Sequence, residues 1–179
     1  LDALGCGVTI PEGGPVLART LDQIPLDQPL DETVFQPVCD ALRKVRKELP
    51  PEKALLGFAG APWTLLAYGL EGKGSKTWSR AKAFIHKEPV KAQKWLEKLA
   101  DAAARLLNLH IEAGAQAVQL FDTWAGELDA DDYATLAEAA NSFRGLIQEG
   151  AKVTRGEGDK AKEEKVSDFR EAMAWLISE

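Results

Sequence analysis

Two short apolar runs, separated by helical sequence, restrict the fold of this chain more than any other feature. Residues 54–58 (ALLGF) and 117–121 (AVQLF) each have the length of one buried strand. Between them, apolar residues recur at the three- and four-residue steps of amphipathic helices. A strand, helices and a second strand predict a parallel sheet with helical crossovers. The sequence therefore predicts an α/β fold.

Apolar spacing and helix-breaking residues place the helices of the first part. A first helix is predicted for 33–49, with an apolar stripe of Val34, Val38, Leu42 and Val45. Pro62 is predicted to open a second helix, and Ser75 to cap a third one over residues 78–85. The longest helix is predicted for 89–113, with a buried stripe of Trp95, Leu99, Ala102, Leu106, Leu109 and Ala113. Residues 1–32 are predicted to be mostly loop, with strand character only at 8–10.

The sequence changes character from Asp129, which predicts a joint between an α/β part, 1–128, and a mostly helical tail, 129–179. Helical spacing over 136–147 predicts a helix that ends at Gly150. Residues 153–155 are predicted as a short strand, and Ser167 is predicted to cap a last helix. Residues 156–165 (GEGDKAKEEK) alternate charges without apolar periodicity, so we expect a solvated loop there.

Composition excludes several classes of protein. The chain has 179 residues with 22 Lys and Arg against 28 Asp and Glu, a net charge of −6. This acidic balance makes a surface for duplex nucleic acid unlikely, because phosphate contacts need clustered cations. No apolar run approaches the roughly 20 residues of a membrane span, and we expect no signal peptide at Leu1. Cys6 and Cys39 are too few for a disulfide framework, which favours the cytoplasm.

The candidate site lies where the two predicted strands end, because functional groups gather at the carboxyl ends of parallel strands. Tyr68 and Thr123 would offer hydroxyl groups to an anionic ligand, and Phe58 and Phe121 would offer apolar walls. Asp122 would place a charge near the pocket or form an ion pair. The alternative is that the aromatic residues simply belong to the core.

Other chemistry is weakly supported. His86 and His110 lie on different predicted helices, where we expect surface or helix-end positions, and no His, Cys, Asp and Glu have metal-ligand spacing. Residues 72–76 (GKGSK) lack the residue order of a phosphate-binding loop. No nucleophile–base set stands out. The residues by themselves therefore predict an α/β ligand-binding fold and no particular reaction.

Two long motifs carry a resemblance to a known family. GFAGAPWTLLAYGLEGKGSK (57–76) and AGAQAVQLFDTWAG (113–126), with LDALGCG near the start, resemble the uroporphyrinogen decarboxylase family over about residues 1–128. The resemblance implies part of a (β/α)8 TIM barrel. It also implies a reaction without cofactor or metal, in which the acetate side chains of uroporphyrinogen III lose CO2 to give coproporphyrinogen III. Tyr68 and Thr123 match positions that contact the substrate. The resemblance further implies that Phe58 lines the same cleft, and it allows a homodimer.

The departures from the family matter as well. The family's substrate-binding Arg residues, its central Asp and its late His fall outside this chain, so no catalytic residue is assigned and we expect negligible activity from this chain alone. The alternative is a non-catalytic fragment that binds a tetrapyrrole or a partner protein. Residues 133–179 resemble a segment of the DNA gyrase B protein, although they can also be a helical continuation of the barrel. A gyrase-derived interaction segment on an unrelated carrier is a third hypothesis. An incomplete barrel predicts a marginal or oligomerising fold.

Overall fold

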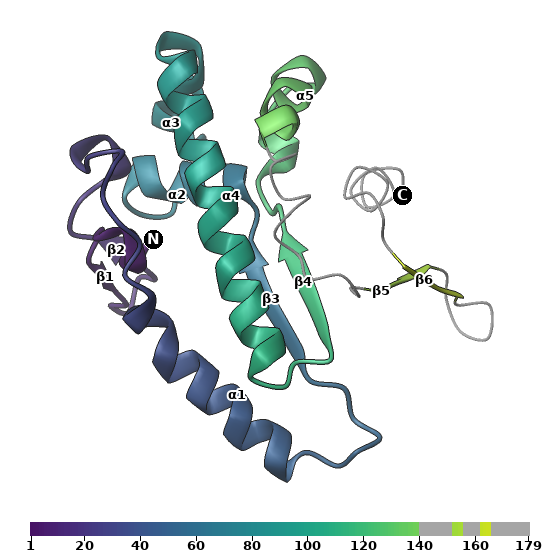
Figure 1. The fold of residues 1–179 in the computed structure, drawn as a ribbon. Coiled ribbons are helices and arrows are strands. Elements are labelled where there is room, and N and C mark those ends of the chain that lie inside the picture. Colours follow the sequence, from purple (N-terminus) through teal and green to yellow (C-terminus); the bar gives the residue numbers. More distant parts are fainter. Residues whose placement is uncertain (140–151, 156–161, 166–179) are drawn as a thin grey trace.

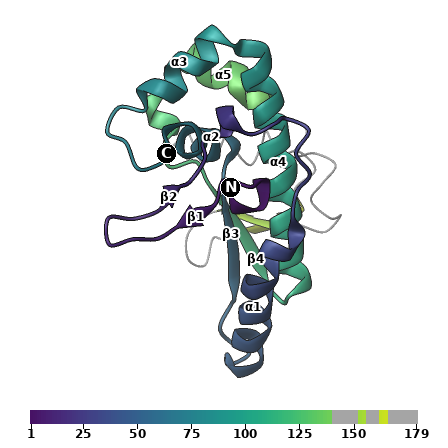
Figure 2. The same ribbon diagram turned by 90° about the vertical axis from the view of Figure 1, so that its left-hand side faces the viewer.

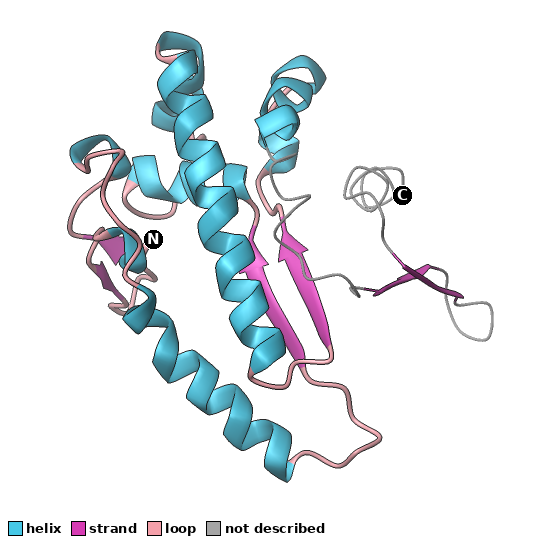
Figure 3. Ribbon diagram, viewed as in Figure 1, coloured by secondary structure: helices cyan, strands magenta, loops and turns pink. Residues whose placement is uncertain are grey.

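Two parallel strands and the helices that connect them form the centre of the molecule. The computed structural model describes residues 1–139, 152–155 and 162–165. Strands β3 (Leu56–Gly60) and β4 (Ala117–Phe121) pair in parallel, in a register that places Leu56 opposite Ala117 and Gly60 opposite Phe121. The connection between them holds α2 (Pro62–Glu71), α3 (Ser79–Lys87) and α4 (Pro89–Glu112) (Figures 1 and 3). The predicted α/β fold is confirmed.

Helix α4 covers one face of this sheet through small residues. Ala100, Ala103 and Ala104 of α4 pack on Ala59 of β3. A Cβ on Gly57 would lie 2.7 Å from the Cβ of His110, so the close approach of helix and strand requires glycine at residue 57. Small residues on both elements thus bring α4 directly onto the backbone of the sheet.

The opposite face of the sheet is exposed, which corrects the prediction of fully buried strands. Leu56 is 54% exposed, Phe58 63% and Phe121 50%, whereas Gly57 and Ala59 are buried beneath α4. Successive side chains of a strand point to opposite faces. Because the described residues supply a helix layer on one face only, every second side chain of β3 stays exposed.

The main core lies beyond the carboxyl ends of the strands. It joins α2 and α3 to the first half of α4 and to the short helices η1 (Asp2–Leu4) and η2 (Leu21–Gln23). Strand character at residues 8–10 is confirmed for β1 (Val8–Thr9), which pairs antiparallel with β2 (Val16–Leu17). Figure 2 shows this hairpin projecting from the side of the molecule. The fully buried large side chains of this core include Leu4, Leu21, Leu66, Leu70, Trp78, Trp95, Leu96 and Leu99.

The first long helix forms, but its apolar stripe is not buried. The predicted range 33–49 contains the end of η3 (Glu32–Phe35), followed by α1 (Gln36–Glu48). Val38 is 48% exposed and Val45 45%, and Cys39 is the buried residue of this helix. Arg46 fixes the end of α1, where its guanidinium donates to the carbonyl of Leu49 at 2.8 Å and to the side chain of Gln116. Figure 1 shows α1 running away from the core.

Helix α3 begins later than predicted, and its cap comes from another helix. Ser75 does not cap it: the Ser75 hydroxyl accepts hydrogen bonds from the backbone N–H groups of Thr77 and Trp78 in the preceding loop. Trp78 takes a left-handed conformation with φ of 51°. The carboxylate of Glu71, at the end of α2, accepts from the backbone N–H of Arg80 at 2.8 Å. A negative charge at a helix N-terminus is favourable, so Glu71 has the role predicted for Ser75.

Helix α4 follows its predicted range closely, but its buried stripe is shifted. Trp95 and Leu99 are buried as predicted, whereas Ala102, Leu106 and Leu109 are only half-buried. The predicted stripe has a mean step of 3.6 residues and so runs straight along the helix, but it follows one edge of the packed face, because Ala100, Ala103 and Ala104 are the residues of α4 that pack on β3. The remaining buried residues of α4 are Ala92, Leu96, Ala100, Ala103, Ala104, Leu107 and His110.

The C-terminal part is described only in pieces. After η4 (Ala125–Glu127), helix α5 (Ala130–Ala139) begins earlier than the predicted helix, whose remainder to Gly150 lies outside the described residues, as does the helix predicted after Ser167. Strand β5 (Lys152–Arg155) confirms the predicted strand. It pairs antiparallel with β6 (Lys162–Lys165), so the predicted loop 156–165 is wrong for its last four residues. Within the described ranges, no helix has the length and apolarity to cross a membrane.

Candidate functional site

The turns that follow β3 and β4 lie side by side at one edge of the sheet. The backbone N–H of Ala61 donates to the carbonyl of Phe121 at 2.8 Å, which extends the strand pairing into the first turn. Helix α2 begins immediately afterwards at Pro62, and Asp122 begins the turn after β4. In Figure 1 both arrows point toward the end of the molecule that holds α2, α3 and α5. The two sequence motifs therefore meet at this edge.

A half-buried hydrogen-bond network fixes the turn after β4. The Thr64 hydroxyl donates to Oδ1 of Asp122 at 2.8 Å and accepts from the backbone N–H of Trp124 at 3.3 Å. The Tyr133 hydroxyl of α5 donates to the same carboxylate. Burial raises the pKa of Asp122 and also raises the pKa of Tyr133, next to that carboxylate.

Asp122 therefore has a positioning role. It belongs to none of the ion pairs among the described residues, so the ion-pair alternative from the sequence is wrong. Its two hydroxyl partners come from α2 and α5. The network holds the backbone on both sides of Thr123, because Asp122 and Trp124 are its immediate neighbours in the chain.

Three aromatic rings connect the two turns. The ring centroids of Tyr68 and Trp78 lie 4.9 Å apart in an edge-to-face arrangement, and those of Trp78 and Trp124 lie 4.6 Å apart. Tyr68 also lies 6.2 Å from Trp124, and the indole N–H of Trp63 donates to the Trp124 carbonyl at 2.8 Å. Sequence reasoning assigned Trp78 to a helix and missed this contact, which depends on the loop before α3.

The predicted site residues lie on both sides of this aromatic cluster. Tyr68 is half-buried, and its hydroxyl has no hydrogen-bond partner among the described residues. Thr123 is exposed, directly before Trp124. Phe58 packs edge-to-face on Phe121, with ring centroids 6.0 Å apart, on the open face of the sheet. The alternative that the aromatic residues are core is thus wrong for these two phenylalanines and correct for Trp63, which is 2% exposed.

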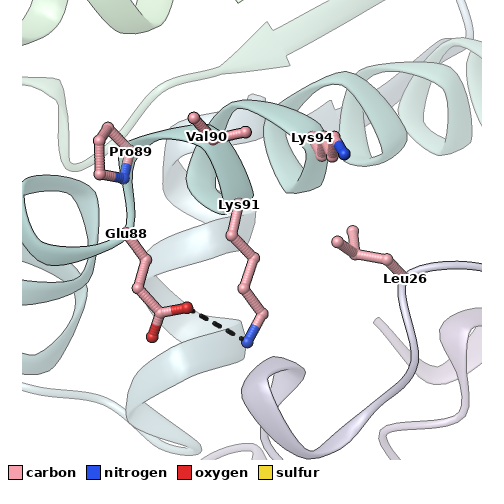
Figure 4. A pocket seen from close by; sticks show the side chains of 6 residues that line it. All are labelled: Leu26, Glu88, Pro89, Val90, Lys91 and Lys94. Atoms are coloured by element: carbon pink, nitrogen blue, oxygen red, sulfur yellow. Dashed lines mark ion pairs between the residues drawn. The ribbon is translucent and has the colours of Figure 1, made fainter.

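A small cavity opens beside Tyr68. Its volume is about 190 Å³, and its walls are Leu1, Val8, Pro15, Leu17, Tyr68, Gly72 and Lys73. A larger hollow of about 420 Å³ lies at the start of α4, where Leu26, Pro89 and Val90 line it together with Lys94 and the Glu88–Lys91 ion pair (Figure 4). None of the residues that line the larger hollow belongs to the two turns, so the candidate site is the edge that holds Tyr68 and Thr123.

The two histidines are not part of this site. His110 lies in the last turn of α4, which confirms the helix-end alternative of its prediction, but it is buried against β3, at 5% exposure, and burial lowers its pKa. His86 is exposed, as predicted, and its Nε2 lies 3.2 Å from Oδ2 of Asp132. In the part of the chain that the structure describes, no group of three or more His, Cys, Asp or Glu residues is placed to hold a metal ion.

Comparison with known proteins gives the family. The family model described as "Uroporphyrinogen decarboxylase (URO-D)" matches residues 1–149. The uroporphyrinogen decarboxylase of Alkalilimnicola ehrlichii is 41% identical over 157 residues, which is 83% of this chain and 42% of that protein. The one from Trichormus variabilis is 44% identical over 142 residues, 76% of this chain and 41% of that protein. The chain belongs to the uroporphyrinogen decarboxylase family.

The matches to this family cover part of the relatives and most of this chain. The chain spans about two-fifths of the length of these relatives. The family match also runs past residue 128 and includes α5, in the part that the sequence analysis compared with DNA gyrase B. Among solved structures, a methyltransferase from Methanosarcina mazei is similar with a TM-score of 0.60 at 18% identity, over 82% of this chain and 45% of that one, which indicates a shared fold.

Proposed function

We propose that this chain carries a substrate-binding part of a uroporphyrinogen decarboxylase. The whole enzyme would convert the acetate side chains of uroporphyrinogen III to methyl groups, yielding coproporphyrinogen III. The observation that carries the proposal is the in-register pairing of β3 and β4, which brings two motifs shared with that family to one edge of the sheet. Relatives named for this activity are 41% to 44% identical to the chain, which supports the assignment.

The residues at this edge suit a flat ligand with anionic arms. The Tyr68 hydroxyl of α2 is available to donate a hydrogen bond to a ligand carboxylate, and Thr123, in the turn after β4, is exposed and offers a second hydroxyl. Phe58 and Phe121 form an apolar wall on which a pyrrole ring can pack. Tyr68, Thr123 and Phe58 are therefore the proposed substrate-binding residues.

Decarboxylation of such an arm is plausible without a cofactor. Protonation of a pyrrole ring carbon gives a cation that accepts the electron pair as the bond between the methylene and carboxylate carbons breaks and CO2 leaves. A second proton converts the methylene to a methyl group, and the ring loses the first proton. The faces of Phe58 and Phe121 can stabilise the transient cation. Because the family's Asp, Arg and His match no position here, we expect negligible turnover from this chain alone.

Ligand binding tests the proposal directly. Anaerobic titration with uroporphyrinogen III should quench tryptophan fluorescence, because Trp78 and Trp124 contact Tyr68. Tyr68→Phe and Thr123→Val should each weaken binding about tenfold, since each removes one hydrogen bond to a charged group. Thr135→Val, at an exposed position of α5, is the control and should bind like the unaltered chain.

The same titration separates the two functions that the sequence left open. Binding accompanied by CO2 release above the uncatalysed rate would show that this chain is itself an enzyme. Binding without product would support a tetrapyrrole-binding part. Absence of binding, or equal binding by all variants, would overturn the proposed site.

Further expectations from the sequence stay predictions. These are a partial (β/α)8 barrel in residues 1–128, a separate tail in 129–179 with a gyrase-like segment, a homodimer, no nucleic-acid partner and a cytoplasmic location. Gel filtration with light scattering would test the homodimer.

A further inference from the structure

The cavity beside Tyr68 is built from two parts of the chain that are held together. The β1–β2 hairpin contributes Val8, Pro15 and Leu17, and the end of α2 contributes Tyr68. The backbone N–H of Leu17 donates to the carbonyl of Gly72 at 2.8 Å, which joins the hairpin to the residue that ends α2. The cavity is therefore a fixed feature of this part of the fold.

The side-chain cation at this cavity, Lys73, makes no contact that stabilises the fold in the described part of the chain. Lys73 lines the cavity and is exposed, and its ammonium has neither an ion pair nor a hydrogen bond among the described residues. Cations on the neighbouring helix α3 are neutralised: Arg80 lies 3.3 Å from Asp22, and Lys82 lies 2.8 Å from Glu127. In a chain of net charge −6, an unpaired ammonium on a residue that lines the same cavity as Tyr68 is suited to bind an anion.

The size of the cavity limits what it can hold. At about 190 Å³ it is smaller than the roughly 300–1,000 Å³ of pockets that enclose whole small-molecule ligands. Its other walls are aliphatic, apart from the tyrosine ring. A single short arm with methylene groups and a terminal carboxylate fits both the volume and the lining, whereas a tetrapyrrole macrocycle does not.

We propose that this cavity binds one carboxylate arm of the ligand, with Lys73 as its counter-ion and Tyr68 as its hydrogen-bond donor. Leu17 and Val8 contact the methylene part of that arm, while the flat body of the ligand stays outside the cavity. This inference rests on the proposed function, and it adds a specificity-determining cation that ordinary hydroxyl contacts would not provide. The cavity selects the arm by its negative charge, so the affinity for the ligand should fall as the salt concentration rises.

Substitutions of neighbouring lysines test this inference by the same fluorescence titration with uroporphyrinogen III. Lys73→Gln should weaken binding about threefold to tenfold, and Lys73→Arg should restore most of the affinity. Lys76→Gln is the matched control, because Lys76 is exposed in the same loop and does not line the cavity. Raising the salt concentration should weaken binding by the unaltered chain more than binding by Lys73→Gln.

The outcomes separate this proposal from the proposed function. If Lys73→Gln binds like Lys76→Gln while Tyr68→Phe still binds weakly, the role of Lys73 is wrong and the substrate site stands. If the unaltered chain does not bind uroporphyrinogen at all, both proposals fail. Equal salt dependence of the unaltered chain and Lys73→Gln would also overturn the role of Lys73.

Discussion

At the scale of single residues, the buried His110 links the stability of the fold to pH. It lies in the last turn of α4, against Gly57, and neither of its ring nitrogens has a hydrogen-bond partner among the described residues. Burial lowers the pKa of His110 from its ordinary value of 6.5. The folded chain thus keeps this imidazole neutral under conditions in which the unfolded chain binds a proton.

The sign of the effect follows from proton linkage. The stability that a neutral His110 permits is fully present above pH 6.5 and is lost as the pH falls below it. Below that pH, the contribution of His110 to the slope of the free energy of unfolding against pH should reach at most about 1.4 kcal/mol per pH unit. His110→Leu should remove this part of the slope, as measured by urea unfolding at several values from about pH 7.5 to 5.5.

The other histidine provides the control for this prediction. His86 is exposed on α3, and His86→Leu should leave the slope in place. Curves of free energy of unfolding against pH that coincide for the unaltered chain and His110→Leu would contradict the assignment. Comparing slopes rather than absolute stabilities matters here, because leucine also changes the packing against Gly57.

At the scale of elements, Thr64 ties helix α2 to the turn after β4. Thr64→Val keeps the shape of the side chain but removes the donor to Asp122 and the acceptor for the Trp124 N–H. Because Thr64 is buried and its partner is a half-buried carboxylate, the free energy of unfolding should fall by about 1.5 to 3 kcal/mol. Thr64→Ser keeps the hydroxyl, so its free energy of unfolding should fall by less. Urea unfolding followed by circular dichroism measures both, and a valine variant as stable as the serine variant would contradict the role of the network.

The helices and strands also show which features of the fold could be predicted from sequence patterns. The start of α2 at Pro62 and both strands were predictable, because proline and short apolar runs act locally. The start of α3 was not, since its cap is Glu71, which lies nine residues before Arg80. The exposure of Phe58 was not predictable either, because an apolar run looks the same whether one or both faces of its strand are covered.

Some residues of the candidate site could also be predicted from the sequence, and others could not. Tyr68 and Thr123 could be named from motifs that resemble a known family, and the parallel pairing brings the start of α2, the helix that holds Tyr68, next to the turn that holds Thr123. The roles of Trp78 and Lys73 could not be named, because both depend on how the loop between α2 and α3 folds back. Trp78 contacts Tyr68, and Lys73 lines the cavity beside it. Only tertiary structure reveals such contacts.

At the scale of the whole molecule, exposed apolar surface predicts self-association. Leu56, Phe58 and Phe121 are exposed on the uncovered face of the sheet, and β3 and β4 each have one edge without a partner strand among the described residues. Exposed apolar patches and unpaired strand edges both promote contacts between chains. We therefore expect the 19.5 kDa chain to form larger species as its concentration rises, as measured by gel filtration with light scattering.

A charge on that face should oppose the association. Leu56→Lys places an ammonium on the open face without touching the proposed substrate residues, and it should shift the chain toward monomer. Val90→Lys is the matched control, because Val90 is 71% exposed at the start of α4, away from the sheet. If the control dissociates the assembly as well, the contact does not involve the sheet face. An unaltered chain that stays monomeric at about 100 µM, with a sharp thermal transition above roughly 65 °C, would contradict the expectation altogether. Such a result would require the described core around Trp78 and Trp95 to stabilise the fold without any cover for the strands.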